Sequence, residues 1–202
     1  GAGQGLTTGA NNNVMGQRAM SGATTTTAYN NIFGYEAGKV MTSGSQNNFF
    51  GCEVGLACTS GANNNVIGHQ AMMSSTTGTY NNIMGYRAAY AGIMVGNGYN
   101  NIFGRQAGYD ITSGNNNNIL GNLTGKKLTT GTHNNIFGYQ SGYNFTTGHY
   151  NNIMGYRAAH AGIMTGSGYN NIFGYEAGYN TTTGQNGIFF GDAGGILYRN
   201  RK

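Results

Sequence analysis

The segment Asn30-Asn31-Ile32-Phe33-Gly34 decides the fold, because close variants of it recur along the whole chain. Successive motif glycines are 17 to 19 residues apart, and they stand at Gly16, Gly34, Gly51, Gly68, Gly85, Gly104, Gly121, Gly138, Gly155, Gly174 and Gly191. A short fixed period is typical of a solenoid, in which each repeat forms one coil. The sequence therefore predicts an all-β, parallel β-solenoid (β-roll) of about eleven coils of 17–19 residues, forming one domain over 1–202 with a short basic tail at 195–202.

Composition excludes several classes of protein. The chain has 202 residues with 38 Gly and no Pro, yet its apolar residues recur in register, which a disordered Gly-rich chain lacks. The net charge is +5, and three of the ten positive residues are Arg199, Arg201 and Lys202 in the tail. Since no basic stripe and no apolar run of membrane-spanning length occurs, we expect neither nucleic-acid binding nor membrane insertion.

Positions within a coil are numbered from the motif glycine as zero, so that equal positions stack into columns. Positions −1 and −2 are apolar in every coil, and neighbouring strand residues point to opposite faces. One column therefore fills the lumen, and the other needs a partner. We expect position −1 to face the lumen and position −2 to form a self-association stripe: Val14, Ile32, Phe49, Val66, Ile83, Ile102, Ile119, Ile136, Ile153, Ile172 and Phe189.

Other columns predict structural roles. Asn fills positions −3 and −4 in every coil but the last, which favours ladders of stacked amides. Position −9 is Thr in ten coils and Val95 in one, a β-branched column that favours a second strand, with the apolar position −10 facing inward. Position +3 is small and is expected inside. At +2, Arg18 stacks over Glu36, and Arg157 stacks over Glu176, which predicts ion pairs.

Catalytic, cofactor and metal sites are not indicated. The five acidic residues form no apparent acid–base pair, and the four histidines occupy different positions without a third ligand nearby in sequence. Cys52 and Cys58 are candidates for a disulfide in an oxidising compartment. The interpretation we favour has Cys58 as a small core residue and Cys52 as a replacement in the Tyr column at +1.

The repeat Asn-Asn-Ile-Phe-Gly-Tyr-x-Ala-Gly, followed by Thr-Thr-Gly, resembles the Asn-Thr-Ala-Ile-Gly-Tyr repeats of phage tail-fibre and related surface proteins. It is more distantly similar to the head domains of trimeric autotransporter adhesins. The resemblance extends from about Leu6 to Gly191 and implies a left-handed β-roll, a trimer, and an extracellular, cell-surface or virion location. The chain departs from these repeats in its bulky Ile at −2 and in lacking an accompanying stalk, anchor or chaperone segment.

Three functions follow as alternatives, and none of them is enzymatic. The leading hypothesis is a structural subunit of an extracellular fibre or filament, associating with itself as a homotrimer or a head-to-tail polymer. The second is an adhesin or tail-fibre segment that binds a surface glycan or receptor through its outer Tyr, Asn and Thr columns. The third, ice binding, rests on a single Thr column, whereas a flat ice-binding face would carry at least two.

Overall fold

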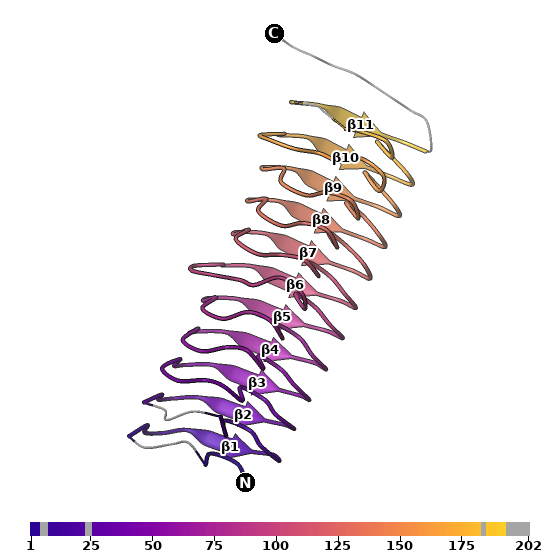
Figure 1. Ribbon diagram of the computed structural model, residues 1–202. Helices are drawn as coiled ribbons and strands as arrows, with labels where there is room; N and C mark the ends of the chain where they lie inside the picture. The colour runs from indigo at the N-terminus through magenta and orange to yellow at the C-terminus, as the bar shows by residue number, and fades with distance from the viewer. Residues whose placement is uncertain (5–7, 23–25, 183–184, 193–202) are drawn as a thin grey trace.

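The computed structural model describes residues 1–4, 8–22, 26–182 and 185–192, so the tail at 195–202 lies outside the described residues. The chain is an all-β parallel solenoid, as predicted, and Figure 1 shows its coils rising in sequence order from β1 to β11. One short strand comes from each coil: β1 Asn13–Met15, β2 Asn31–Phe33, β3 Asn48–Phe50, β4 Asn65–Ile67, β5 Asn82–Met84, β6 Asn101–Phe103, β7 Asn118–Leu120, β8 Asn135–Phe137, β9 Asn152–Met154, β10 Asn171–Phe173 and β11 Ile188–Phe190. The left-handed sense of the coil stays a prediction.

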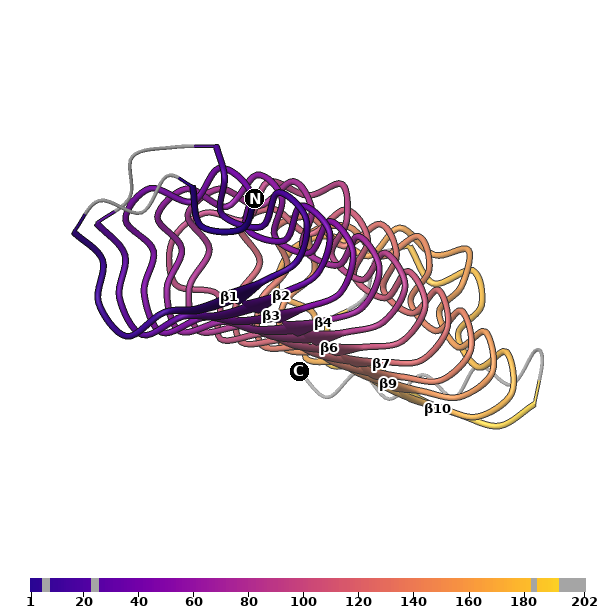
Figure 2. The same cartoon turned by 90° about the horizontal axis from the view of Figure 1, so that it is seen from below.

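The register of the sheet follows the sequence columns. Every strand pairs in parallel with its sequence neighbours, and equal positions face each other, as in Ile32 opposite Phe49. The view along the stack in Figure 2 shows the strands gathered along one wall of the coil, while turns and loops complete the circuit. The repeat length therefore sets one strand per coil and places each motif residue directly beside its counterpart.

The predicted second strand at positions −9 and −10 is wrong for the described coils, which carry one strand each. The Thr column still stacks through its main chain, since Thr42 N donates to Thr59 O at 2.8 Å. Ser43 N donates to the same oxygen at 3.1 Å, and Thr59 and Ser60 likewise share Thr76 O. Two neighbouring N–H groups that reach one carbonyl mark a bend, because an extended strand points them in opposite directions.

Position −2 faces the lumen, so the assignment of the two apolar columns was wrong. The expected self-association stripe is buried inside its own coils: Ile32, Phe49, Val66, Ile102, Ile119, Ile136, Ile153 and Ile172 are fully inaccessible, Ile83 and Phe189 nearly so, and Val14 in the first strand packs against this core. Position −10 faces inward as expected, with Met41, Cys58 and Leu128 fully buried. The Ala column at +3 completes the core.

The motif glycine permits the tight stacking at the end of each strand. Gly51 has φ of +137°, a conformation that side chains of L-residues rarely adopt. A Cβ added there would overlap the carbonyl oxygen of Gly68 in the next coil. The same overlap recurs along the column, so both the backbone conformation and the close approach of the coils require glycine.

The two Asn columns form ladders that face opposite sides of the coil wall. The inner ladder at −4 is buried, and Asn30, Asn47, Asn64, Asn81, Asn100, Asn117, Asn134 and Asn151 are completely inaccessible. Asn64 Nδ2 donates to Asn47 Oδ1 at 3.0 Å and to Gly78 O at 2.8 Å. Asn64 Oδ1 accepts from the backbone N (3.0 Å) and the Nδ2 (3.1 Å) of Asn81. One amide side chain thus joins three consecutive coils with no polar atom left without a partner.

Replacing Asn64 by Ala should destabilise the solenoid by about 3 kcal/mol or more, because it leaves several buried polar groups without partners. The matched control is Asn65→Ala in the exposed outer ladder, which should cost less than about 1 kcal/mol. Urea unfolding followed by circular dichroism measures both. Equal losses for the two variants would contradict a special role for the inner ladder.

Candidate functional site

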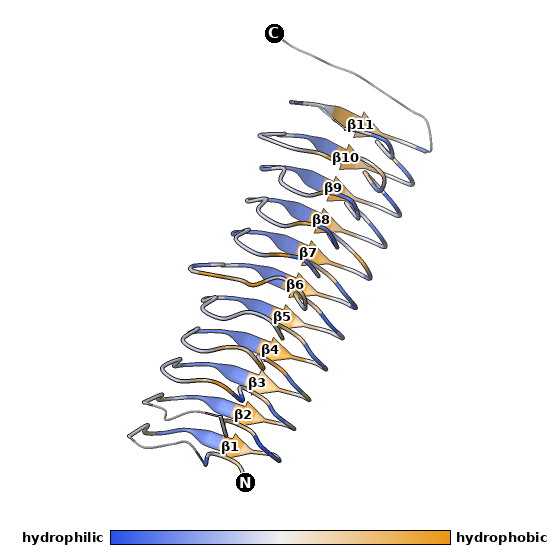
Figure 3. Cartoon of the chain, viewed as in Figure 1, coloured by the Kyte–Doolittle hydropathy of each residue, from blue (hydrophilic) through white to orange (hydrophobic). Residues whose placement is uncertain are grey.

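The outer face of the sheet is the most regular surface of the molecule. Positions −5, −3, −1 and +1 all point outward, and each forms a column that runs along the stack. Figure 3 shows the hydrophilic start and the hydrophobic end of successive strands aligned as two parallel bands. We call this surface, made of these four columns, the sheet face. It is the candidate site because its four columns point away from the core and run along the whole stack.

The outer Asn ladder at −3 forms one band of the sheet face. Asn31 Nδ2 donates to Asn48 Oδ1 at 2.7 Å, Asn48 Nδ2 to Asn65 Oδ1 at 2.6 Å, and Asn65 Nδ2 to Asn82 Oδ1 at 2.9 Å. These contacts use one of the two N–H groups and one of the two oxygen lone pairs of each amide. The ladder therefore stiffens the face and keeps one donor and one acceptor per coil for another molecule.

The apolar column at −1 is the second band, and it is exposed. Met15 is 64% accessible, Met84 45%, Ile67 42% and Leu120 38%. Neighbouring rings stack along the column, with Phe33 and Phe50 at a centroid distance of 5.0 Å. A continuous apolar stripe on a protein surface indicates that another molecule covers it. Self-association through an apolar column, if it occurs, must therefore use position −1 and not position −2.

Aromatic residues flank these bands at −5 and +1. Their rings stack face to face between coils, as Tyr80 does on Tyr99 and Tyr150 on Tyr169, both at 4.8 Å. At +1, Tyr156 lies between Tyr139 and Tyr175, at 5.3 and 5.1 Å. Stacked rings turn their edges and hydroxyl groups to solvent, and a ring face stays open only where the neighbouring coil carries no ring.

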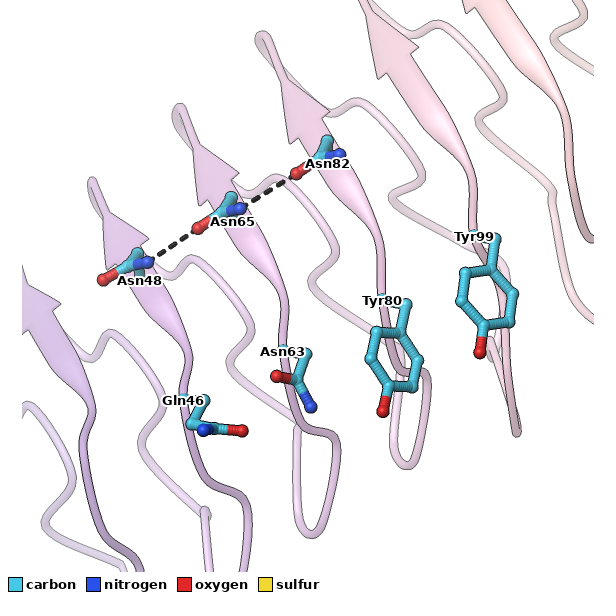
Figure 4. Close-up of a pocket in the computed structure, with 7 residues that line it drawn as sticks. All are labelled: Gln46, Asn48, Asn63, Asn65, Tyr80, Asn82 and Tyr99. Atoms are coloured by element: carbon cyan, nitrogen blue, oxygen red, sulfur yellow. Dashed lines mark hydrogen bonds between the residues drawn. The ribbon is translucent and has the colours of Figure 1, made fainter.

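One such interruption produces a groove of about 480 Å³ between columns −5 and −3. It is lined by Gln46, Asn48, Asn63, Asn65, Tyr80, Asn82 and Tyr99. Figure 4 shows the three ladder amides along one side of the groove, and the two amides and two Tyr rings along the other. The lining is uncharged throughout. Position −5 was not singled out from the sequence, although its alternation of amides and rings was a usable signal.

The predicted ion pairs at +2 form. Arg18 Nη1 lies 2.6 Å from Glu36 Oε1, and Arg157 Nη1 lies 2.8 Å from Glu176 Oε1. Lys39 adds a second cation at 3.2 Å from Glu36. Burial raises the pKa of Glu36, but the hydrogen bond from Lys39 and the charges of Arg18 and Lys39 outweigh it, so the pKa is lowered overall. Arg18 and Arg157 remain accessible to solvent while Glu36 is buried, so solvent screens the pairs in part and they adjust the stacking of coils more than they stabilise it.

The possible disulfide between Cys52 and Cys58 is not formed, and both thiols are free. Cys58 is fully buried in the lumen, whereas Cys52 takes the place of an outward Tyr at +1. Burial raises the pKa of Cys58 to about 11. Burial, followed by the charges of Glu53 and Glu36, raises the pKa of Cys52. The two side chains thus occupy opposite sides of the coil wall, in agreement with the interpretation that Cys58 belongs to the core.

A column that the sequence reasoning missed lies at +5. Tyr90, Tyr109, Lys126, Tyr143, His160 and Tyr179 follow one another in consecutive coils. His160 is stacked between Tyr143 and Tyr179, at 5.2 Å from each ring, and Lys126 lies over the rings of Tyr109 and Tyr143 at 5.5 and 5.3 Å. The column is partly buried and packs against the coil wall, which favours a stabilising role.

The described part of the chain holds no group of three or more His, Cys, Asp or Glu residues arranged to bind a metal ion. Within the same residues, no helix is long and apolar enough to cross a membrane. The chain matches no protein-family model, no curated protein and no solved structure. The function must therefore be argued from the sheet face itself.

Stability should decrease at acid pH because of His160. Burial, followed by the charge of Arg157, lowers the pKa of this imidazole against a smaller opposing effect of Glu176. As pH falls below the ordinary His value of about 6.5, the unfolded chain takes up a proton before the folded one, and folding weakens until the folded imidazole also protonates.

The matched variant is His160→Tyr, because the corresponding residue four coils earlier is Tyr90. Thermal unfolding between pH 7.5 and 5 should show a smaller loss of stability in His160→Tyr than in the unmodified chain. Parallel pH profiles for the two proteins would show that His160 does not carry the effect.

Proposed function

We propose that the protein is a structural subunit of an extracellular fibre or filament, and that other copies of the same chain cover columns −3 to +1 of its sheet face. The observation that carries this proposal is the apolar column at −1, which continues over all eleven strands and is exposed in seven of them and partly exposed at Phe33, Phe103, Phe137 and Phe173. An isolated monomer would leave this stripe in water. The resemblance to tail-fibre repeats supports an extracellular or virion setting.

A second copy fits this face better than an unrelated partner. Eleven coils at the spacing of parallel strands make a face about 48 Å long, and the width from −3 to +1 is about 13 Å. Pairing two such faces buries about 1,200 Å² in total, at the lower limit of stable interfaces. Another copy repeats the same coil spacing, so that its side chains interdigitate along the whole length, as in a dry interface between paired sheets.

The electrostatics of the face also favour contact between identical copies. Columns −1 and −3 carry no charged residue in any coil, and the charges between −3 and +1 are Arg105 and Asp192 at +1, so two identical faces meet with little like-charge repulsion. A trimer would turn three such stripes toward a common axis, and a dimer would pair two. The outer edges of β1 and β11 each lack a strand partner within the described residues, and their main-chain groups would pair with a further coil in a head-to-tail polymer.

Charges placed on the apolar column should abolish association. Ile67→Lys combined with Leu120→Lys introduces two unpaired charges, each costing several kcal/mol when buried in an interface, and should raise the dissociation constant by roughly a hundredfold or more. The control is Ile93→Lys combined with Ile163→Lys. Those residues are 53% and 55% exposed and lie in the two 19-residue coils, outside the sheet.

Sedimentation velocity over a range of concentrations, with electron microscopy of the same samples, measures the assembly. The unmodified chain and the control should associate, and the variant of the apolar column should stay monomeric. A monodisperse monomer of the unmodified chain at high concentration would refute the proposal, as would equal association of both double variants.

A further inference from the structure

The groove on the sheet face lies beside the start of a block, residues 80–104, that recurs with few changes as residues 150–174. Position −5 reads Gln46, Asn63, Tyr80, Tyr99 in four consecutive coils, and four coils later it reads Asn116, His133, Tyr150, Tyr169. The two Tyr residues are unchanged, but Asn63 has become His133. This replacement decides whether the first Tyr of each pair has a ring stacked on both of its faces.

In the later half the ring face is covered. His133 stacks on Tyr150 at 4.8 Å with an interplanar angle of 18°, and Tyr169 stacks on the other side of Tyr150 at 4.8 Å. In the earlier half Tyr99 covers one face of Tyr80 at 4.8 Å, while the neighbour on the opposite side is the smaller, non-aromatic Asn63. Tyr80 is 44% exposed and lines the groove together with Asn63. Tyr150 is 41% exposed, so the two rings are almost equally accessible, and what distinguishes Tyr80 is the groove beside Asn63, where no ring stacks on it.

The polar groups around this groove are neutral amides. Asn48, Asn65 and Asn82 each keep one N–H and one oxygen lone pair beyond those used in their ladder, and Gln46 and Asn63 add two more amides. Figure 4 shows the ladder amides along one side of the groove, with Gln46 and Asn63 in the same row as Tyr80 along the other. Donors and acceptors thus alternate around an aromatic face, and no charged side chain lines the groove.

We propose that this groove binds a pyranose unit of an uncharged glycan. The ring faces of Tyr are electron-rich and attract the polarised C–H groups on the apolar face of a sugar. Sugar hydroxyl groups both donate and accept, which matches the amides of the lining. An anionic ligand would lack a cationic partner in the groove. The volume lies within the range of small-molecule sites and leaves room for the chain to continue along the ladder.

The groove shares column −3 with the surface proposed for self-association, whereas its column −5 lies outside the width from −3 to +1 used for that contact. The variant Ile67→Lys with Leu120→Lys should stay monomeric and leave the groove uncovered, so it should bind the glycan at least as tightly as the unmodified chain, and failure of either proposal can be recognised separately. Both residues lie at −1 and outside the groove lining.

The chain supplies its own matched variants. Asn63→His should place an imidazole on Tyr80, as His133 does on Tyr150, and lower the affinity about tenfold or more, the upper range of one lost stacking contact. His133→Asn should remove the ring stacked on Tyr150, create a second groove like the one beside Tyr80 and raise the number of sites from one to two. Each new residue is already found in the same backbone conformation, since Asn63 and His133 have φ of 58° and 57°.

Isothermal titration calorimetry with hexasaccharides of glucose, N-acetylglucosamine and mannose gives affinity and stoichiometry, and circular dichroism checks that each variant is folded. Saturable binding of at least one hexasaccharide at one site, lost in Asn63→His and doubled in His133→Asn, supports the proposal. The double exchange should restore one site. Absence of binding by all three probes, unchanged binding in Asn63→His, a single site in His133→Asn, or preference for sulfated or sialylated oligosaccharides would overturn it.

Discussion

The hydrogen bonds of the inner Asn ladder hold the coils in register. Each buried amide donates to the amide of the preceding coil and accepts from the following one, so a chain of hydrogen bonds runs the length of the lumen wall. Most of these amides also donate to a backbone carbonyl at the next corner, as Asn47 does to Gly61 O at 2.8 Å. A buried amide is tolerated only when its polar atoms are satisfied, which here requires an identical residue above and below. The repeat of the sequence is thus a condition for the stability of every coil.

The same ladder fixes the direction of the remaining side chains. Because the Asn at −4 points inward, strict alternation directs −3 outward, −2 inward and −1 outward. The lumen receives the mostly β-branched column, and the Phe, Met, Ile and Leu column is displayed outside. The face that we propose for association with other copies is therefore a consequence of how one amide is buried.

Repetition also explains why a local site can arise from one substitution. In a column of stacked rings each face covers the next, and the surface offers edges and hydroxyl groups. Where Asn63 interrupts the column, a groove lies beside Tyr80 and no ring stacks on that side, whereas His133 stacks on Tyr150 at the equivalent place. Positions at which otherwise similar coils differ are accordingly the informative ones for binding, and the constant spacing of the stacked coils supplies the rigid support around them.

The sequence by itself determined the parallel solenoid, the number of coils, the stacked Asn ladders, the inward column at −10 and the ion pairs at +2. All of these follow from a repeat of nearly constant length, which places like residues one above another. It did not determine which apolar column faces the lumen, because −1 and −2 are equally apolar and alternation permits either choice. Only the tertiary structure decided this, through the amide at −4, which reaches the carbonyl at the next corner from inside the coil alone. Three further features depend on how the coil closes in space, which local residue preferences do not specify. They are the bend at the Thr column, the separation of Cys52 from Cys58 and the groove beside Tyr80.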